Sequence, residues 1–373
     1  MPQPPATAAP PNRWLIRVAG IFADSEADIL RALGAEALKK LETEYLLIRL
    51  ADPSLLHGSP AAKFVRWNLP VHHSWPCCPP DITGFIEKAA QALARKFAAS
   101  QPQAVIIGAL DPGGSNRYYR ALASNLRGRT LQLFPPEVAA LRDAEAQVSR
   151  APTLFCLVGK DGLFCGLQSP KNSNGFYPGG TKFIRQNAPG TISRAGAKIA
   201  EALHHLQLDR SPPPPGSHWL ELGASPGGMT TELLARGYQV TAVDRAALDA
   251  RLANARGLQA VVADAATFQP ARGTTYDAIL SDMNGDPLES IAQVIRLAKY
   301  LRPGGLVVFT LKLPGVTTFA ETNAVEAAVV AAATRAGLQL TARTHLSYNR
   351  HEFTLFFAPH APLAPFPAAA KFL

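Results

Sequence analysis

Residues 219–229, which read Trp-Leu-Glu-Leu-Gly-Ala-Ser-Pro-Gly-Gly-Met, constrain the fold of this chain more than any other stretch. Trp219 to Leu222 have the length and apolar character of a buried strand, residues 223–228 form a glycine-rich turn, and Met229 begins a predicted helix. Such a strand–turn–helix unit brings backbone N–H groups against an adenosine-containing cofactor. Glycine suits the turn because a Cβ atom would block the close approach. The motif predicts a cofactor site but does not identify the cofactor.

The sequence after this turn alternates predicted strands and helices. We expect strands at 219–222, 238–244, 259–264, 276–282 and 306–312, with helices at 229–236, 248–255 and 288–301. This alternation predicts a doubly wound, mostly parallel sheet. A further helix at 319–336 precedes two strands, at 338–347 and 352–358, and the short connection between them predicts an antiparallel hairpin at the end of the sheet.

The first 170 residues contain smaller α+β units. Residues 13–70 are predicted to form a ferredoxin-like unit, with strands at 14–20 and 45–50, a helix at 26–33, and a proline-rich loop or linker from 56 to 80. Residues 71–170 form a second unit. In it we expect helices at 81–98 and 117–126 and strands at 104–108, 130–134 and 152–158.

Composition limits the class of protein. The formal net charge is +9, which favours a polyanionic partner such as nucleic acid. No apolar run approaches the roughly 18 residues that span a bilayer, so no membrane association is expected. Residues 1–12 lack the pattern of a signal peptide, which predicts a disordered leader and a cytoplasmic location. The tail at 359–373 is expected to be loose.

Cysteine and histidine spacing does not suggest a metal site. The four cysteines, Cys77, Cys78, Cys156 and Cys165, include no Cys-x-x-Cys pair and are predicted to be reduced thiols. The pair His72-His73 has no set of partner ligands at suitable spacing. We therefore predict no bound metal.

A basic linker and entry helix, residues 171–200, precede the glycine turn and contain no acidic residue. The candidate RNA-binding residues in it are Lys171, Lys182, Arg185 and Arg194. Phe176, Tyr177 and Phe183 are interleaved with glycines, a pattern that suits phosphate contact together with base stacking. The alternative is a solvated linker. A helix is predicted at 193–206 with Ser193 as its N-cap, and four prolines at 212–215 then predict an extended linker.

Four successive predicted strands each end in a charged residue. Asp244 ends the second strand, about 20 residues after the glycine turn, where a carboxylate accepts hydrogen bonds from ribose hydroxyls. Asp264, Asp282 and Lys312 end the next three strands. Ligands of such sheets bind at the carboxyl ends of the strands, so these side chains are expected to converge on one site. A nicotinamide dehydrogenase shares this arrangement, but its Gly-x-Gly-x-x-Gly turn is absent, since Ser225 occupies the second glycine position.

These motifs resemble those of FtsJ-type S-adenosylmethionine-dependent RNA 2′-O-methyltransferases. The resemblance is carried by Gly223-Ala-Ser-Pro-Gly-Gly228, Ser281-Asp-Met283, Leu311-Lys312 and Arg350-His-Glu352. It implies a Rossmann-like class I methyltransferase domain at 201–358. It also implies a catalytic Lys-Asp-Lys-Glu tetrad at Lys198, Asp282, Lys312 and Glu352. The implied contacts of S-adenosylmethionine are Ser193, Gly223, Ser225, Pro226, Gly227, Gly228, Met229, Asp244, Asp264 and Asp282.

Within that family, the chain is most similar to bacterial enzymes that methylate a cytidine of 23S rRNA. The segment 173–183 and the tetrapeptide Leu311-Lys-Leu-Pro314 carry this resemblance. It implies a THUMP-type RNA-binding region at 71–170, and 23S rRNA or a ribosome assembly intermediate as partner of a monomer or weak homodimer. Glu221 replaces the usual aspartate, and Met229 replaces a tryptophan, so one packing contact beside the cofactor is expected to differ.

The family resemblance makes Lys312 the candidate general base for the ribose 2′-hydroxyl. A neutral amine requires a lowered pKa, which burial and Lys198 would favour and the carboxylates Asp282 and Glu352 would oppose. Carbon-5 methylation of cytosine needs a cysteine nucleophile, yet no cysteine follows Cys165. The remaining alternatives are an inactive RNA-binding or assembly factor with the same fold, an RNA 2′-O-methyltransferase with another target, and a small-molecule O-methyltransferase.

Overall fold

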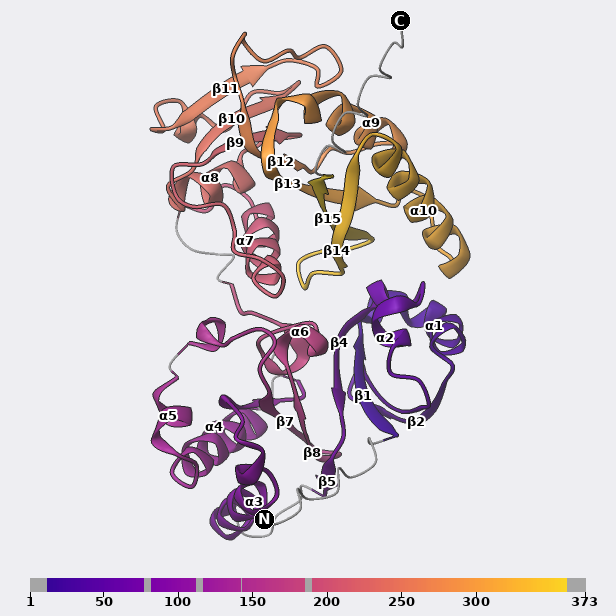
Figure 1. Cartoon of the computed structure of the whole chain (residues 1–373), viewed down its shortest axis with the longest axis vertical. Helices are drawn as coiled ribbons and strands as arrows, with labels where there is room; N and C mark the ends of the chain where they lie inside the picture. Colours follow the sequence, from indigo (N-terminus) through magenta and orange to yellow (C-terminus); the bar gives the residue numbers. More distant parts are fainter. Residues whose placement is uncertain (1–11, 77–81, 112–116, 142, 185–189, 361–373) are drawn as a thin grey trace, which may run out of the picture. The chain divides into compact units, whose positions relative to one another are not determined.

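The computed structural model describes residues 12–76, 82–111, 117–141, 143–184 and 190–360. Predictions made for residues 1–11, Cys77, Cys78, Arg185 and residues 361–373 lie outside these ranges. The chain divides into two compact units. The N-terminal unit comprises Met1–Phe183 and His204–Arg210, and the C-terminal unit comprises Ile184–Leu203 and Ser211–Leu373. Figure 1 shows the elements of each unit.

The first sheet of the N-terminal unit has the strand order β2-β3-β1-β4. Its strands are β1 (Arg13–Val18), β2 (Ala35–Leu41), β3 (Tyr45–Leu50) and β4 (Val65–Pro70), and α1 (Glu26–Leu33) connects β1 to β2. All neighbouring strands are antiparallel. This is the split β-α-β arrangement expected for a ferredoxin-like unit.

The prediction of a loop across residues 56–80 is wrong at its centre, because β4 runs through it. All six residues of β4 are buried, and Trp67 and Leu69 have no exposed surface. Pro70 is the last residue of β4, which is an edge strand of this sheet, so its missing N–H costs little. Burial of Trp67 and Leu69 therefore outweighs the local turn signals of the surrounding prolines.

The second sheet of the N-terminal unit has the order β5-β8-β7-β6. Its strands are β5 (His73–Trp75), β6 (Ala104–Ala109), β7 (Thr153–Gly159) and β8 (Gly162–Gln168), and the helices α3 (Ile82–Phe97) and α4 (Tyr118–Leu131) pack against each other beside it. The predicted strand at 130–134 is wrong. Thr130 belongs to the last turn of α4, where its hydroxyl donates to the Leu126 carbonyl at 2.7 Å.

The C-terminal unit contains the predicted doubly wound sheet, with the order β11-β10-β9-β12-β13-β15-β14. Its strands are β9 (His218–Leu222), β10 (Gln239–Asp244), β11 (Leu258–Val262), β12 (Tyr276–Ser281), β13 (Leu301–Lys312), β14 (Leu338–Thr344) and β15 (Glu352–Pro359). The first five are parallel, and β15 pairs antiparallel with both β13 and β14. The predicted doubly wound fold of this unit and its terminal hairpin are confirmed, whereas the THUMP-type assignment of residues 71–170 stays a prediction.

The helices of this unit are α7 (Ala195–Leu206, whose last three residues belong to the N-terminal unit), α8 (Gly228–Ala235), α9 (Pro287–Leu297) and α10 (Phe319–Arg335). In Figure 1, α9 and α10 lie side by side. The predicted helix at 248–255 is wrong, because only Ala250–Leu252 form a short helical turn. Leu252 instead fills the space beside Gly227, where a Cβ of that glycine would collide with it.

Candidate active site

The glycine turn after β9 has the tight packing that its sequence predicts. Gly223 has a φ of +79°, and a Cβ there would lie 2.9 Å from the Met283 backbone. At Gly228, a Cβ would collide with the Ser193 hydroxyl oxygen. Ser193 also accepts a hydrogen bond from the N–H of Ala195, the first residue of α7, at 3.3 Å. A side chain is therefore excluded at Gly223, and one at Gly228 would require Ser193 to move.

A cavity of about 430 Å³ lies at the carboxyl ends of β9, β10 and β12. Its lining includes five of the predicted cofactor residues, which are Gly223, Ser225, Asp244, Asp264 and Asp282. The other five, Ser193, Pro226, Gly227, Gly228 and Met229, do not line it. For these five, contact with a cofactor stays a prediction.

Sequence reasoning missed the contribution of α9 to this cavity. Glu289, Ser290 and Gln293 line it together with Met283 and Asn284, which directly follow Asp282. Positions 289, 290 and 293 fall on one side of a helix, and α9 begins soon after β12. The sequence did contain a signal for this contribution. Glu289, Ser290 and Gln293 are polar residues in the first two turns of the helix that follows β12, a strand that ends directly before Asp282.

Two carboxylates at the cavity are oriented by backbone N–H groups. Asp244 accepts from Ser225 at 3.0 Å and from Ala246 at 2.8 Å, so it ties the glycine turn to the end of β10. Asp264 accepts from Ala266 at 2.8 Å. Each carboxylate oxygen can accept a second hydrogen bond, so both residues keep the capacity to bind hydroxyl or amino groups of a ligand.

The structure brings the four tetrad residues together in one ion-pair network. Lys312 Nζ lies 2.8 Å from Asp282 Oδ1 and 2.8 Å from Glu352 Oε2. Lys198 also pairs with Glu352, and its Nζ lies 3.8 Å from Asp282 Oδ2. Lys312 and Glu352 are direct partners across β13 and β15. Because Asp282 also lines the cavity, the network borders the predicted cofactor site.

The charges of the network stabilise one another. Burial lowers the pKa of Lys312, but Asp282 and Glu352 outweigh burial and raise it above the ordinary value. Burial raises the pKa of Glu352, but Lys198 and Lys312 outweigh that effect and lower it. At neutral pH, Lys312 is therefore an ammonium ion in this structure, so it must lose a proton before it can act as a base.

Glu221 is the next-to-last residue of β9, with 2% of its surface exposed. It accepts a hydrogen bond from the Thr230 hydroxyl at 2.7 Å, which links β9 to α8. Burial raises the pKa of its carboxyl to about 8, with smaller contributions from Asp282 and Asp244 in the same direction. This acid therefore holds the strand and helix that flank the glycine turn.

The basic segment is only partly available for RNA. Lys171 forms an ion pair with Asp209, and Lys182 forms one with Glu145. The expectation that Phe176 stacks on bases is wrong, because 1% of it is exposed and it lies in the core of the N-terminal unit.

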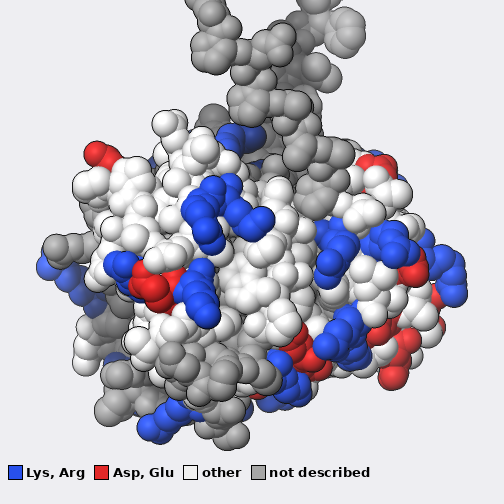
Figure 2. Space-filling model, turned by 90° about the horizontal axis from the view of Figure 1, so that it is seen from below, with Lys and Arg blue, Asp and Glu red and all other residues white. Residues whose placement is uncertain are grey.

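In contrast, 88% of Phe183 is exposed, and Arg194 is also exposed. Contact of Lys171, Lys182 and Arg194 with RNA stays a prediction. On the face shown in Figure 2, the blue surface of Lys and Arg side chains is more extensive than the red surface of acidic ones.

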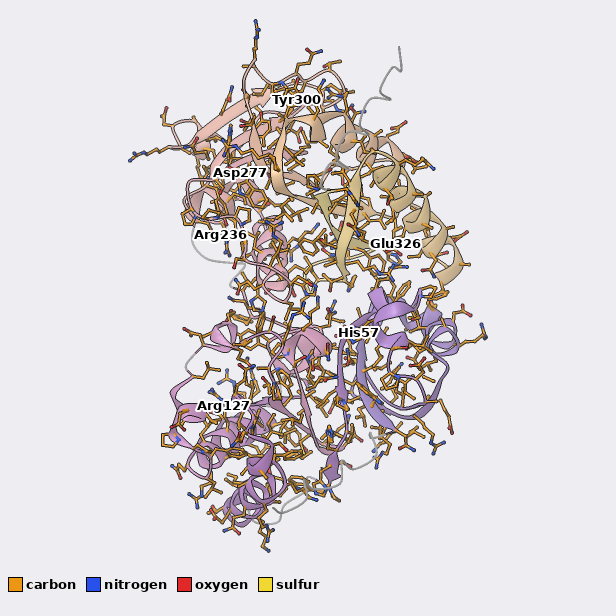
Figure 3. All side chains as sticks on the ribbon, viewed as in Figure 1. His57, Arg127, Arg236, Asp277, Tyr300 and Glu326 are labelled. Carbon is orange, nitrogen blue, oxygen red and sulfur yellow. The ribbon has the colours of Figure 1, made fainter. Side chains whose placement is uncertain are left out.

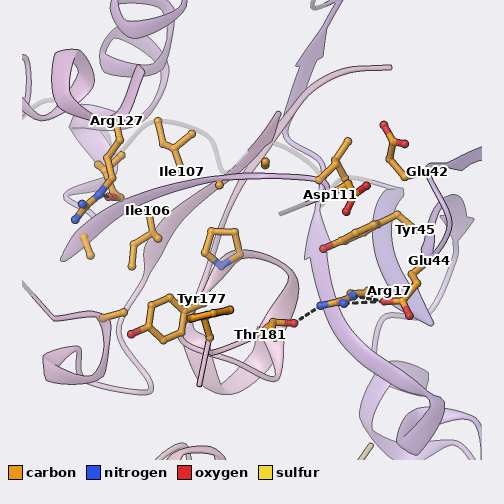
Figure 4. A pocket seen from close by; sticks show the side chains of 18 of the residues that line it. Arg17, Glu42, Glu44, Tyr45, Ile106, Ile107, Asp111, Arg127, Tyr177 and Thr181 are labelled. Atoms are coloured by element: carbon orange, nitrogen blue, oxygen red, sulfur yellow. Dashed lines mark hydrogen bonds and ion pairs between the residues drawn. The ribbon is translucent and has the colours of Figure 1, made fainter. Parts of the chain in front are cut away.

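A larger cavity, of about 670 Å³, lies in the N-terminal unit between β6 and the turn that connects β2 and β3 (Figure 4). Arg17 lies at its wall and is already engaged by Glu44 at 2.7 Å and by the Gly179 carbonyl at 2.8 Å. None of the tetrad residues lines this cavity. The candidate active site is therefore the smaller cavity in the C-terminal unit.

The described ranges contain no group of three His, Cys, Asp or Glu side chains that could hold a metal ion. In the same ranges, no helix is long and apolar enough to cross a membrane.

Comparison with known proteins assigns the class of this domain. Residues 191–330 match the family model of the FtsJ-like methyltransferases. The strand order, the cavity at the carboxyl ends of the strands and this match make the region an FtsJ-like methyltransferase domain. The predicted family resemblance is thus confirmed.

The curated relatives are more specific. "Ribosomal RNA large subunit methyltransferase M" of Halorhodospira halophila is 37% identical over 142 residues, which are 37% of this chain and 40% of that protein. The protein of the same name from Shewanella amazonensis is 28% identical over 230 residues, which are 58% of this chain and 62% of that protein. The chain thus matches about half the length of these relatives.

Among solved structures, Aeropyrum pernix fibrillarin in complex with S-adenosyl-L-methionine has a TM-score of 0.34 and 16% identity, covering 57% of this chain and 85% of that one. The fold assignment therefore rests on the strand order.

Proposed function

We propose that this chain is an S-adenosylmethionine-dependent methyltransferase that modifies a ribose 2′-hydroxyl of large-subunit rRNA, with a cytidine of 23S rRNA as target. One observation carries the proposal. Asp282 lines the cavity at the strand ends and also contacts both lysines of the tetrad. The names of the curated relatives support rRNA of the large subunit as substrate.

S-adenosylmethionine would supply an electrophilic methyl group on a positively charged sulfur. The residues suited to hold it are Asp244 for the ribose, Asp264 for the adenine amino group, and the N–H groups of the glycine turn. Gln293 and Glu289 of α9 offer further polar contacts in the same cavity.

The tetrad would orient and deprotonate the ribose hydroxyl. In the proposed reaction, Lys312 first releases its own proton to solvent and then, as a neutral amine, accepts the 2′-hydroxyl proton, while Asp282 and Glu352 hold its Nζ in place. The 2′-oxygen would bond to the methyl carbon as the bond from that carbon to sulfur breaks, which would leave the sulfur as a neutral thioether. The positive sulfur of a bound S-adenosylmethionine would disfavour the ammonium form of Lys312 and so would offset the effect of the two carboxylates. Lys198 pairs with Glu352 and helps to lower the pKa of that carboxyl, which keeps Glu352 charged and in place. Positioning of the hydroxyl supplies much of the remaining rate enhancement.

The N-terminal unit would bind the RNA around the target. We propose that residues 71–170 serve as its THUMP-type RNA-binding region, and that Arg194 contacts phosphates near the active site. The excess of positive charge suits this partner. The proposed substrate is 23S rRNA or an assembly intermediate, which would place a monomer or weak homodimer in the cytoplasm.

The test is nucleotide-resolution mapping of 2′-O-methyl groups in rRNA from cells with and without the gene. We expect one methylated cytidine of the large subunit to lose its modification and to regain it when the gene is restored. Binding of S-adenosylmethionine to the purified full chain is measured in parallel. An unchanged methylation map together with no cofactor binding would overturn the proposal and favour an inactive RNA-binding factor.

A further inference from the structure

The loop between β14 and β15, residues 345–351, leads directly into Glu352 of the tetrad. Glu352 is the first residue of β15, so the position of its carboxylate depends on how the loop enters this strand. The loop is short, and its side chains bond both within the loop and to β15. The His345 ring contacts the Arg350 carbonyl at 2.9 Å, and the Asn349 side-chain amide donates to the Thr354 hydroxyl at 3.2 Å.

Glu201 of α7 binds this loop through two consecutive backbone N–H groups. One carboxylate oxygen accepts from Ser347 at 3.0 Å, and the other accepts from Tyr348 at 3.3 Å. Only 4% of Glu201 is exposed. A buried carboxylate is costly unless its oxygens are bonded, and charge-assisted bonds of this kind are stronger than neutral ones. The pair of bonds therefore fixes the loop backbone to α7.

Glu201 follows Lys198 by three residues, which is less than one turn of helix. One short stretch of α7 thus carries both a cation of the tetrad and the group that holds the loop leading to Glu352. Lys198 itself pairs with Glu352. Helix α7 therefore carries Lys198 and also, through Glu201, holds the loop that precedes its partner Glu352.

We propose that Glu201 is a positioning residue of the active site, which holds Glu352 in place against Lys198 and Lys312 by fixing the backbone of Ser347 and Tyr348. This inference rests on the proposed function, because it concerns the same tetrad. The hydroxyl of Tyr348 also donates to the Ile184 carbonyl at 3.0 Å and accepts from the Ile184 N–H at 2.9 Å. The loop therefore also holds the start of the segment that leads to α7.

The substitution Glu201→Gln in the full chain tests this role. Glutamine keeps the size of the side chain, but its NH₂ group faces one of the two N–H donors, so one of the two bonds is lost. We expect faster hydrogen exchange in residues 345–351 and a roughly 10- to 100-fold lower kcat, the range expected when a reacting group is displaced by about 1 Å. Affinity for S-adenosylmethionine should stay within about twofold, because Glu201 does not line the cavity.

The pH dependence separates positioning from general stabilisation. Glu352 contributes to the raised pKa of Lys312, so its displacement lowers that pKa. We expect the acidic limb of the kcat profile of Glu201→Gln to move to lower pH. The matched control is Glu326→Gln, which removes another acid with 4% exposure that pairs with Arg343 at 3.0 Å, on α10 (Figure 3). It should lower the melting temperature and leave the pH profile unchanged.

An unchanged kcat and pH profile in Glu201→Gln, or an equal shift in Glu326→Gln, would overturn the inference. If Glu201→Gln does not fold, Glu201→Asp keeps the charge but shortens the reach, and the same measurements apply. The titration of the Lys312 amine by NMR needs no RNA. If the wild-type chain transfers no methyl group, the proposed function fails, but this titration still decides whether Glu201 positions Glu352. A lower Lys312 pKa in Glu201→Gln than in the wild type supports the role, and an unchanged pKa refutes it.

Discussion

The substitution Lys312→Met removes the amine at the centre of the tetrad while keeping most of the apolar stem. It breaks the ion pair of this amine with Asp282 at 2.8 Å and the one with Glu352, also at 2.8 Å. Two carboxylates then share the single charge of Lys198. Loss of one partner of a fully buried ion pair costs about 3–5 kcal/mol, and of a surface pair about 0–1 kcal/mol. The three side chains keep 8% to 17% exposure, so we expect an intermediate cost of about 2 kcal/mol in the free energy of unfolding.

The effect on catalysis should be larger than the effect on stability. General base catalysis contributes about 10²- to 10⁴-fold, which corresponds to about 3–5 kcal/mol of the activation free energy. We therefore expect single-turnover methyl transfer to rRNA to slow by that factor, with cofactor affinity changed by less than about threefold. The assay uses labelled S-adenosylmethionine for transfer and calorimetry for binding.

The control for this prediction is Lys299→Met. Lys299 is exposed, and its amine lies 5.2 Å from the centre of the Tyr300 ring, away from the tetrad. It should leave the rate of transfer unchanged. If Lys312→Met transferred methyl groups at the wild-type rate with unchanged cofactor affinity, the assignment of Lys312 as base would be refuted.

Two further predictions concern the glycine turn and the strand before it. The folded state holds the proton of Glu221 up to a pH of about 8, above the ordinary value of 4.5, so stability should fall as the pH rises between these values. Glu221→Gln stays neutral and can still bind Thr230. Between pH 5 and pH 9, urea unfolding should therefore show a smaller loss of unfolding free energy in Glu221→Gln than in the wild type. Equal losses in the two proteins would contradict the raised pKa of Glu221. Gly223→Ala should abolish cofactor binding, because its Cβ would lie 2.9 Å from the Met283 backbone. The control is Gly237→Ala, which has a similar φ of +77° but whose Cβ would lie 3.5 Å from its nearest neighbour; it should lose stability and still bind the cofactor in a titration. Equal cofactor affinity in the two variants would refute the steric argument.

Local patterns in the sequence determined much of the C-terminal unit. Short apolar runs that alternate with helical segments located the strands of the sheet, because a buried strand needs a run of neighbouring apolar residues. The glycines of residues 223–228 also predicted a tight turn, because glycine is the residue that tolerates positive φ values and close approach of the backbone. The family motifs then named Lys198, Asp282, Lys312 and Glu352 before any distance between them was known.

The tertiary structure decided how those residues meet. Lys312 and Glu352 are 40 positions apart, and they face each other because the register of β13 and β15 makes them direct partners. Register depends on packing across the whole sheet, so no local pattern contains it.

Packing also decided the roles of residues whose sequence context suggested something else. Glu145 and Asp209 hold Lys182 and Lys171, which the sequence assigned to RNA, and Phe176 is buried. The sequence thus determined which chemical groups this protein carries. Only the folded chain decided which of them stand beside the cavity, because contacts between distant residues arise from packing.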